Sequence, residues 1–171
     1  SPTQQHNLSV RGGTEKIKYY GYLGYTDQET FFKKNGGGYK RYNLRSNVDA
    51  QVTDDLNVQL DLTNIWEVRD LPWRVFNGSS NTIWQEYWNT EPYFNSSNPD
   101  GSLAYGGAGG SIGINALSNK ETGGYERDES NQLLASLALN YDLSKIIKGL
   151  KTRAFVNINQ STSFNKKWRY L

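Results

Sequence analysis

Residues 40–67, KRYNLRSNVDAQVTDDLNVQLDLTNIWE, decide the fold because their apolar and polar side chains alternate. The even positions of the first half are Tyr42, Leu44, Ser46, Val48, Ala50 and Val52, and the odd positions carry charges and amides. Leucine or valine occupies positions 56, 58, 60 and 62 of the second half. Successive side chains of a strand point to opposite faces, so the pattern predicts strands over 40–53 and 56–68. A tight turn over 53–55 joins them into a hairpin with one apolar and one polar face.

The same alternation recurs in four other stretches and predicts strands over about 5–12, 16–28, 130–142 and 150–163. Leu8 and Val10 share one face of the first stretch, for example, against Asn7 and Ser9. Three apolar residues interrupt the polar faces near the end of the chain, as is expected where a lumen is packed: Leu134, Ala138 and Phe155.

Short and long connections alternate between these six strands. The turns over 13–15, 53–55 and 143–149 are short, whereas 29–39 is longer and about 69–127 is very long. A structureless loop of that length argues against a compact soluble domain. In outer-membrane barrels, periplasmic turns are short and extracellular loops are long. We therefore expect one long outer loop.

Composition supports a membrane barrel. Hydrophobic residues make up 36% and mean hydropathy is −0.76, yet aromatics reach 13%, with 12 Tyr and 5 Trp. Disordered chains are poor in aromatics, and no apolar run approaches the ~20 residues of a membrane helix. The smallest membrane barrels need about 8 strands. The expected fold is therefore all-β: an antiparallel segment of about six strands, with residues 1–171 forming part of one large transmembrane β-barrel.

Several classes of chemistry are excluded by the residues. The chain has no Cys, so disulfides and thiolate metal sites are absent, and its +2 net charge is spread without a basic face for nucleic acid. No pair of carboxylates or other catalytic constellation stands out, so we expect no enzyme, no cofactor and no metal. The sequence lacks an initiating Met and a signal peptide, which indicates a mature piece or an internal segment.

Three segments in order carry a resemblance to a family: QQHNLSVRGGTEK over 4–16, GYTDQ over 24–28 and YKRYNLRSNVD over 39–49. They resemble the early barrel of SusC/RagA-type TonB-dependent transporters of Bacteroidetes outer membranes. The resemblance implies a barrel of about 22 strands that is filled by a plug, energised through TonB and covered by a SusD-like surface lipoprotein. The plug and a TonB-contacting segment are absent from this sequence.

Candidate binding residues lie in the long loop and on the polar face. Flat rings suit sugar faces, so Trp73, Trp84, Trp88 and Tyr93 are candidate glycan contacts. Their alternatives are loop packing, contact with the lid protein and, for Trp66 at the loop root, an interfacial aromatic belt. A second group is expected to face the lumen, in contact with the plug or in a solvated charge lattice: Arg41, Arg45, Asp49 and Asp61.

His6 and residues 98–102 are also candidate ligand sites, and each has a simpler structural interpretation. The single histidine, His6, is expected at the lid side or at the membrane interface. Residues 98–102, NPDGS, offer oxygen ligands for calcium, but they lack further acidic positions and favour a plain turn.

The functional hypothesis is a barrel-wall segment of a transporter that imports oligosaccharides across the outer membrane of a Gram-negative bacterium. Its expected partners are the rest of the barrel with its plug, TonB, the SusD-like lipoprotein, lipid and a glycan. Alternatives are a peptide-importing RagA-like transporter, a passive porin and a soluble β-sandwich that binds carbohydrate.

Overall fold

The computed structural model describes residues 2–30, 37–72 and 124–168, together with 88, 93, 95, 97–102 and 104. The described residues form six strands: β1 (Thr3–Gly13), β2 (Ile17–Glu29), β3 (Gly38–Gln51), β4 (Leu56–Pro72), β5 (Tyr125–Asp142) and β6 (Lys151–Trp168). No helix in the described part of the chain is long and apolar enough to cross a membrane.

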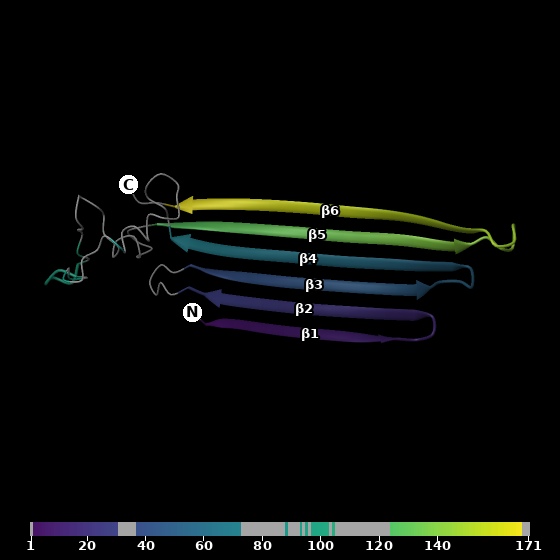
Figure 1. Cartoon of the computed structure of the whole chain (residues 1–171), viewed down its shortest axis with the longest axis horizontal. Coiled ribbons are helices and arrows are strands. Elements are labelled where there is room, and N and C mark those ends of the chain that lie inside the picture. Colours follow the sequence, from purple (N-terminus) through teal and green to yellow (C-terminus); the bar gives the residue numbers. More distant parts are fainter. Residues whose placement is uncertain are drawn as a thin grey trace.

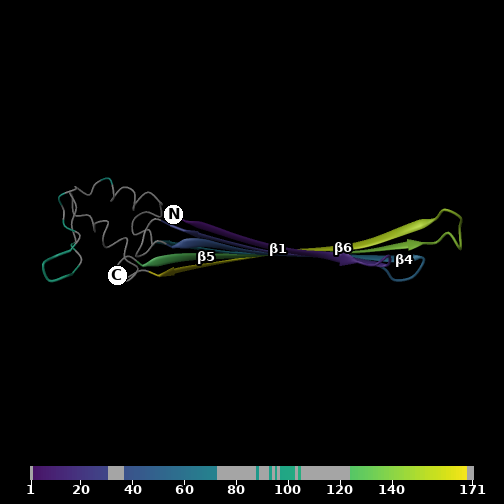
Figure 2. The same ribbon diagram turned by 90° about the horizontal axis from the view of Figure 1, so that it is seen from below.

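The six strands lie side by side in one antiparallel sheet, in the order of the sequence (Figure 1). The turns β1–β2, β3–β4 and β5–β6 lie at one end of the sheet, and the start of β1 and the end of β6 lie at the other end (Figure 1). Seen along its edge, the sheet is a single twisted layer (Figure 2). The expectation of an all-β, six-stranded antiparallel segment is confirmed.

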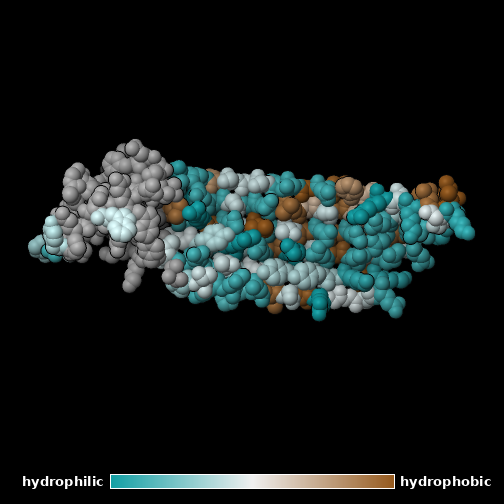
Figure 3. Space-filling view, viewed as in Figure 1, coloured by the Kyte–Doolittle hydropathy of each residue, from teal (hydrophilic) through white to brown (hydrophobic). Residues whose placement is uncertain are grey.

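The register places the alternating residues of all six strands on two common faces. Val48 of β3 pairs with Tyr19 of β2 and with Leu60 of β4, and Leu60 pairs in turn with Leu137 of β5. We give the name apolar band to the following aliphatic residues on this face: Leu8, Val10, Ile17, Leu23, Leu44, Val48, Ala50, Leu56, Val58, Leu60, Leu62, Leu133, Ala135, Leu137, Leu139, Ala154, Val156 and Ile158. We call the other face the polar face. Figure 3 shows one face of the sheet, on which most of the coloured residues are hydrophilic.

The sheet has almost no interior of its own. Among the described apolar residues, only Ala138 is buried, at 4% exposed, whereas Leu8 and Val156 of the apolar band remain 67% and 61% exposed. The described residues provide no second sheet to cover this band, so the β-sandwich alternative lacks its second layer.

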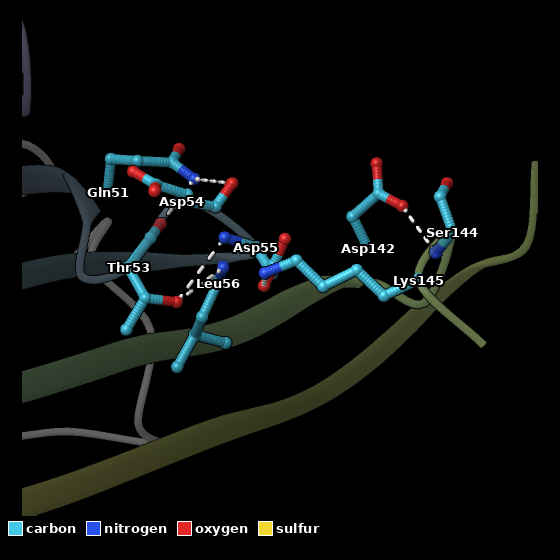
Figure 4. A network of polar contacts seen from close by, with 8 residues as sticks. All are labelled: Gln51, Thr53, Asp54, Asp55, Leu56, Asp142, Ser144 and Lys145. Carbon is cyan, nitrogen blue, oxygen red and sulfur yellow. Dashed lines mark hydrogen bonds and ion pairs between the residues drawn. The ribbon is translucent and has the colours of Figure 1, made fainter.

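Polar side chains close the turns at the short-turn end. The Thr53 hydroxyl accepts hydrogen bonds from the backbone N–H groups of Asp55 (3.3 Å) and Leu56 (3.1 Å), which fixes the β3–β4 turn. Lys145 of the β5–β6 turn forms an ion pair with Asp55, so the two turns are joined (Figure 4). The Asp55 carboxylate raises the pKa of Lys145. The side chain of Lys145 is 75% exposed, so this pair links the turns without a buried charge.

Strand ends differ from the expected boundaries, mostly where the strands approach the long connections. β4 continues to Pro72 and β5 begins at Tyr125, so the expected loop of 69–127 is shorter by the residues that pair there. β6 likewise runs to Trp168, five residues beyond the expected end at 163. Cross-strand charges explain the extensions: Arg127 binds Asp70 through two hydrogen bonds of 2.6 and 2.8 Å, and Lys167 lies 3.2 Å from Glu126. β3 ends at Gln51, two residues early, because Val52 already bonds across the turn to Leu56.

Candidate functional site

The four side chains expected to face the lumen share the polar face. Arg41, Arg45 and Asp49 are spaced four residues apart on one side of β3, and Asp61 of β4 pairs with Asn47 on the same side. The register therefore brings all four to one surface, as the alternation predicted. Whether that surface lines a lumen stays a prediction.

Amide and carboxylate groups form a lattice across β3 and β4 on this face. Asp49 accepts hydrogen bonds from Asn57 (2.6 Å) and Gln59 (3.3 Å), and Asp61 accepts one from Asn47. Asn140 of β5 extends the lattice by donating to Asn57 at 3.2 Å. Both carboxylates accept their hydrogen bonds from neutral amide donors on the neighbouring strand.

Near the long-connection end, the polar face carries a charged cluster around Glu67. Its carboxylate accepts a 2.6 Å hydrogen bond from the Tyr39 hydroxyl and lies 3.5 Å from Nε of Arg41. Arg45 lies opposite Tyr22 on one side and Thr63 on the other, and it forms no ion pair with the described residues. Arg45 therefore offers the polar face a cation that can bind an external anion.

The three apolar residues that the sequence places on the polar face near the end of the chain lie on β5 and β6. Ala138 pairs directly with Phe155, and Leu134 lies on the same side, four residues away along β5. The Phe155 ring is 64% exposed. This exposed ring forms a small apolar patch on an otherwise hydrated surface.

The loop aromatics fall only partly within the described chain. Trp73 and Trp84 lie outside the described residues. Trp88 and Tyr93 are described and are 78% and 75% exposed. Those two rings can be reached by a ligand, whereas their contact with a glycan stays a prediction.

Residues 98–102 form a closed turn. The backbone N–H of Gly101 donates to the Asn98 carbonyl at 3.0 Å, and the Asp100 carboxylate accepts from the Ser102 N–H (2.9 Å) and hydroxyl (2.6 Å). These bonds to Ser102 lower the pKa of Asp100. The Asp100 carboxylate is occupied within its own turn, and the described residues contain no cluster of three metal-ligating side chains. The plain-turn interpretation therefore accounts for the motif.

An aromatic row crosses four strands at one border of the apolar band, and alternation alone did not identify it. The row consists of His6, Tyr25, Tyr42 and Trp66, with ring centroids 6.4, 5.1 and 5.2 Å apart in that order. Its members pair directly in the register of β1–β4. Only the register shows that these rings are neighbours, although the sequence allows an interfacial position for both His6 and Trp66. Amphipathic rings in such a row are typical of the boundary between hydrocarbon and water.

The fold and the two faces define an antiparallel sheet of amphipathic strands, the arrangement found in the wall of a transmembrane β-barrel. Three solved structures have similar folds, each at 23% identity. They are the RagAB peptide importer in the "closed-closed" state (TM-score 0.66, 98% of this chain), the RagAB peptide transporter (0.62, 95%) and the importer in the "open-open" state (0.63, 95%).

The chain spans 18% of the length of each of those solved chains. No protein-family model and no curated protein matches the sequence. The comparisons therefore establish a likeness of fold over nearly the whole chain.

Proposed function

We propose that the chain forms part of the wall of an outer-membrane β-barrel of the SusC/RagA type, which imports a nutrient in a TonB-dependent step. The height of the apolar band carries this proposal. Leu56 and Trp66 bound the band on β4 and are ten residues apart, which is about 33 Å along a strand. At the usual barrel tilt of about 40°, this length spans about 25 Å along the membrane normal, the height of the lipid-facing band of such barrels.

The two edge strands support a larger barrel. Every residue of β1 and of β6 is exposed. Unpaired backbone groups are costly in lipid, so these edges require further strands from the rest of the barrel. In that barrel the polar face lines the lumen, where Arg41 and Arg45 contact the plug or its hydration layer.

The two ends of the sheet support an orientation. The short turns join β1 to β2, β3 to β4 and β5 to β6, and they face the periplasm in our proposal. The long connection after β4 then faces outward, where a SusD-like lipoprotein covers the barrel.

The proposed substrate is an oligosaccharide, held in part by loop aromatics. Trp88 and Tyr93 are the two described members of the set, and their exposure supports stacking against sugar rings. Trp73 and Trp84 belong to the same proposal from sequence alone.

Peptide import is the second candidate, favoured by one specific observation. The solved structures with a similar fold are those of a peptide importer. A peptide would use the loop aromatics for its apolar side chains and the charges of the polar face for its termini.

Transport by the barrel that contains these strands tests the proposal. Cells that express it should bind and take up an oligosaccharide pool, and uptake should stop when the proton-motive force or TonB is removed. Uptake that continues without energy would indicate a passive porin, and competition by oligopeptides instead of sugars would favour the second candidate.

A matched pair of variants tests the loop aromatics. Trp88→Ala and Tyr93→Ala should each weaken ligand binding by about tenfold, as loss of one stacking contact of ~1.4 kcal/mol would. Tyr141→Ala removes an aromatic at the short-turn end and should leave binding unchanged. Equal affinities of all three variants would contradict a role for the loop rings.

A further inference from the structure

The β5–β6 turn differs from the other two short turns in length and in composition. It covers residues 143–150, LSKIIKGL, whereas residues 14–16 and 52–55 join the other hairpins. Ile146 and Ile147 stand at its tip and are 77% and 60% exposed. This turn projects farthest from its end of the sheet in Figure 1, and hydrophobic side chains are visible there in Figure 3. An apolar tip therefore extends beyond two largely polar turns.

Backbone hydrogen bonds close the β5–β6 turn below its tip. The Leu143 N–H donates to the Leu150 carbonyl at 2.9 Å. The Leu143 carbonyl accepts hydrogen bonds from the N–H groups of Ile146 and Ile147, at 2.8 and 3.0 Å. The ion pair of Lys145 also ties this turn to the β3–β4 turn (Figure 4). Two β-branched side chains are thus held exposed by a closed backbone.

The ends of the three hairpins are staggered along the strands. The last pair of β1–β2 is level with Asp49 of β3, and β3 continues for two more residues to Gln51. The last pair of β5–β6 contains Asp142, which is level with Asp55, two residues beyond the partner of Gln51. Each hairpin therefore ends about 7 Å beyond the previous one, across about 10 Å of sheet. The line through these ends is inclined by about 35° to the perpendicular of the strands, which agrees with the strand tilt of membrane barrels.

This stagger places the β5–β6 turn at a definite depth in a membrane. On β4 the apolar band ends at Leu56, one residue beyond the last pair of its hairpin. The equivalent position on β5–β6 is the pair of Leu143 with Leu150, and both continue the alternation of the band. The headgroup layer beyond the hydrocarbon is about 5–7 Å deep on each side. Ile146 and Ile147, the next apolar residues of the turn, therefore fall within that layer.

Lysines border the apolar tip. Lys145, Lys148 and Lys151 are spaced three residues apart around the isoleucines. The first and the last have aspartate partners, whereas Lys148 forms no ion pair with the described residues. An exposed apolar pair beside a lysine is typical of segments that lie in a membrane surface, because the ammonium reaches the phosphates while the apolar groups leave water.

We propose that the β5–β6 turn is anchored in the headgroup layer of the periplasmic leaflet, with Ile146 and Ile147 inserted among the phospholipids and Lys148 bound to their phosphates. The turn sets the depth of the wall on this side, as the aromatic row does at the other border of the apolar band. This inference rests on the proposed function, because only a barrel whose short turns face the periplasm brings this turn to that leaflet.

Spin labels at single cysteines test the depth of the tip. This chain has no Cys, so Ile146→Cys can carry a nitroxide in the barrel that contains these strands once any other cysteine of that barrel is replaced. The nitroxide collides with oxygen in the membrane and with an uncharged nickel chelate in water. In phospholipid vesicles, the ratio of oxygen to nickel collisions at position 146 should lie between the ratios of two references. Leu60→Cys is the hydrocarbon reference, and Asp54→Cys, on the polar β3–β4 turn, is the water reference.

The collisions also identify the alternatives. A ratio at position 146 equal to that at position 54 would place the tip in water and overturn the inference. Few collisions with either reagent would mean that protein covers the tip, which would overturn it as well. A barrel that does not enter the vesicles, or in which position 60 is reached by nickel, would count against the proposed function instead.

Charge reversal tests the phosphate contact. Lys148→Glu places a carboxylate beside the lipid phosphates and should raise nickel collisions at position 146 severalfold in vesicles that contain phosphatidylglycerol. Lys16→Glu makes the same change on the β1–β2 turn and should leave position 146 unchanged. Collisions that do not respond to Lys148→Glu, or that respond equally to both variants, would overturn the role of Lys148 in the anchor.

Discussion

The two faces of the sheet come from the same strands but differ in how their side chains are satisfied. On the polar face, donors and acceptors are matched across neighbouring strands, as Asn57 and Gln59 are with Asp49. On the apolar band, side chains such as Leu60 (46% exposed) have nothing over them in the described chain, which favours an apolar partner outside the sheet. The polar side chains therefore find hydrogen-bond partners within the sheet, whereas the apolar side chains lack a covering layer among the described residues.

Lysine substitutions of two neighbouring residues on opposite faces should give the largest difference in the free energy of unfolding. Leu60→Lys places a charge near the middle of the apolar band and should lower the free energy of unfolding in lipid vesicles by about 2–4 kcal/mol. Gln59→Lys, one residue away on the polar face, lies opposite Asp49 and should change it by less than about 1 kcal/mol. Equal losses in denaturant titrations of the two variants would contradict the two-faced assignment.

Within the apolar band, the cost of a lysine substitution should depend on its distance from the middle of the band. Leu62→Lys, close to the middle of the band, should cost about 2–4 kcal/mol, and Leu56→Lys at its short-turn border about 0–1 kcal/mol. The readout is again unfolding in lipid vesicles. A cost that does not vary with depth would show that the band is not aligned with a bilayer.

Loss of a hydrogen bond on the polar face should have a smaller effect. Asp61→Ala removes the acceptor of Asn47 and should lower the free energy of unfolding by about 1 kcal/mol, since water can replace the bond. Thr63→Ala on the same face, whose side chain forms no hydrogen bond with the described residues, serves as the control. A loss of free energy as large as that of Leu60→Lys would mean that water cannot reach the polar face to replace the hydrogen bond.

The ion pair between the turns should give the smallest effect. Lys145→Ala should leave the unfolding midpoint unchanged within error at neutral pH, because the ammonium is well hydrated. Since the folded pKa of Lys145 is raised, any contribution is complete below its ordinary value of 10.5 and is lost only as pH rises through the higher folded pKa. A difference between wild type and variant that changes between pH 6 and 9 would contradict this assignment.

Sequence alone predicted the faces but not every strand end. Alternation with a period of two shows which residues share a face of a strand, so the sequence predicts apolar faces that contain Val48 and Leu60, and the register pairs these two residues. The segment ERDE over 126–129 has no apolar alternation and lies before the expected start of the strand at 130, with Glu126 and Arg127 in the expected loop. It is part of β5 because Asp70 and Lys167 on the flanking strands supply the opposite charges. Such complementarity exists only once the register is set.

The aromatic row also depends on the register, so alternation alone does not identify it. His6 and Trp66 are far apart in the sequence, and nothing local shows that Tyr25 and Tyr42 lie between them. A search for rings at equal depth along successive predicted strands would have found the row. The exposure of Trp88 and Tyr93 depends on loop packing, which has no periodic signal.

The neighbour-to-neighbour strand order has a consequence for the order of assembly. Every pairing joins consecutive strands, so closing each short hairpin costs little conformational entropy. The strands can therefore pair one after another in the order of the sequence. Only the β4–β5 pairing spans residues 73–124, and its closure costs about 2 kcal/mol more than that of the β3–β4 turn, at ~0.6 kcal/mol per doubling of length. We therefore expect β1–β4 and β5–β6 to form as two separate units that join last, along the seam where Arg127 meets Asp70.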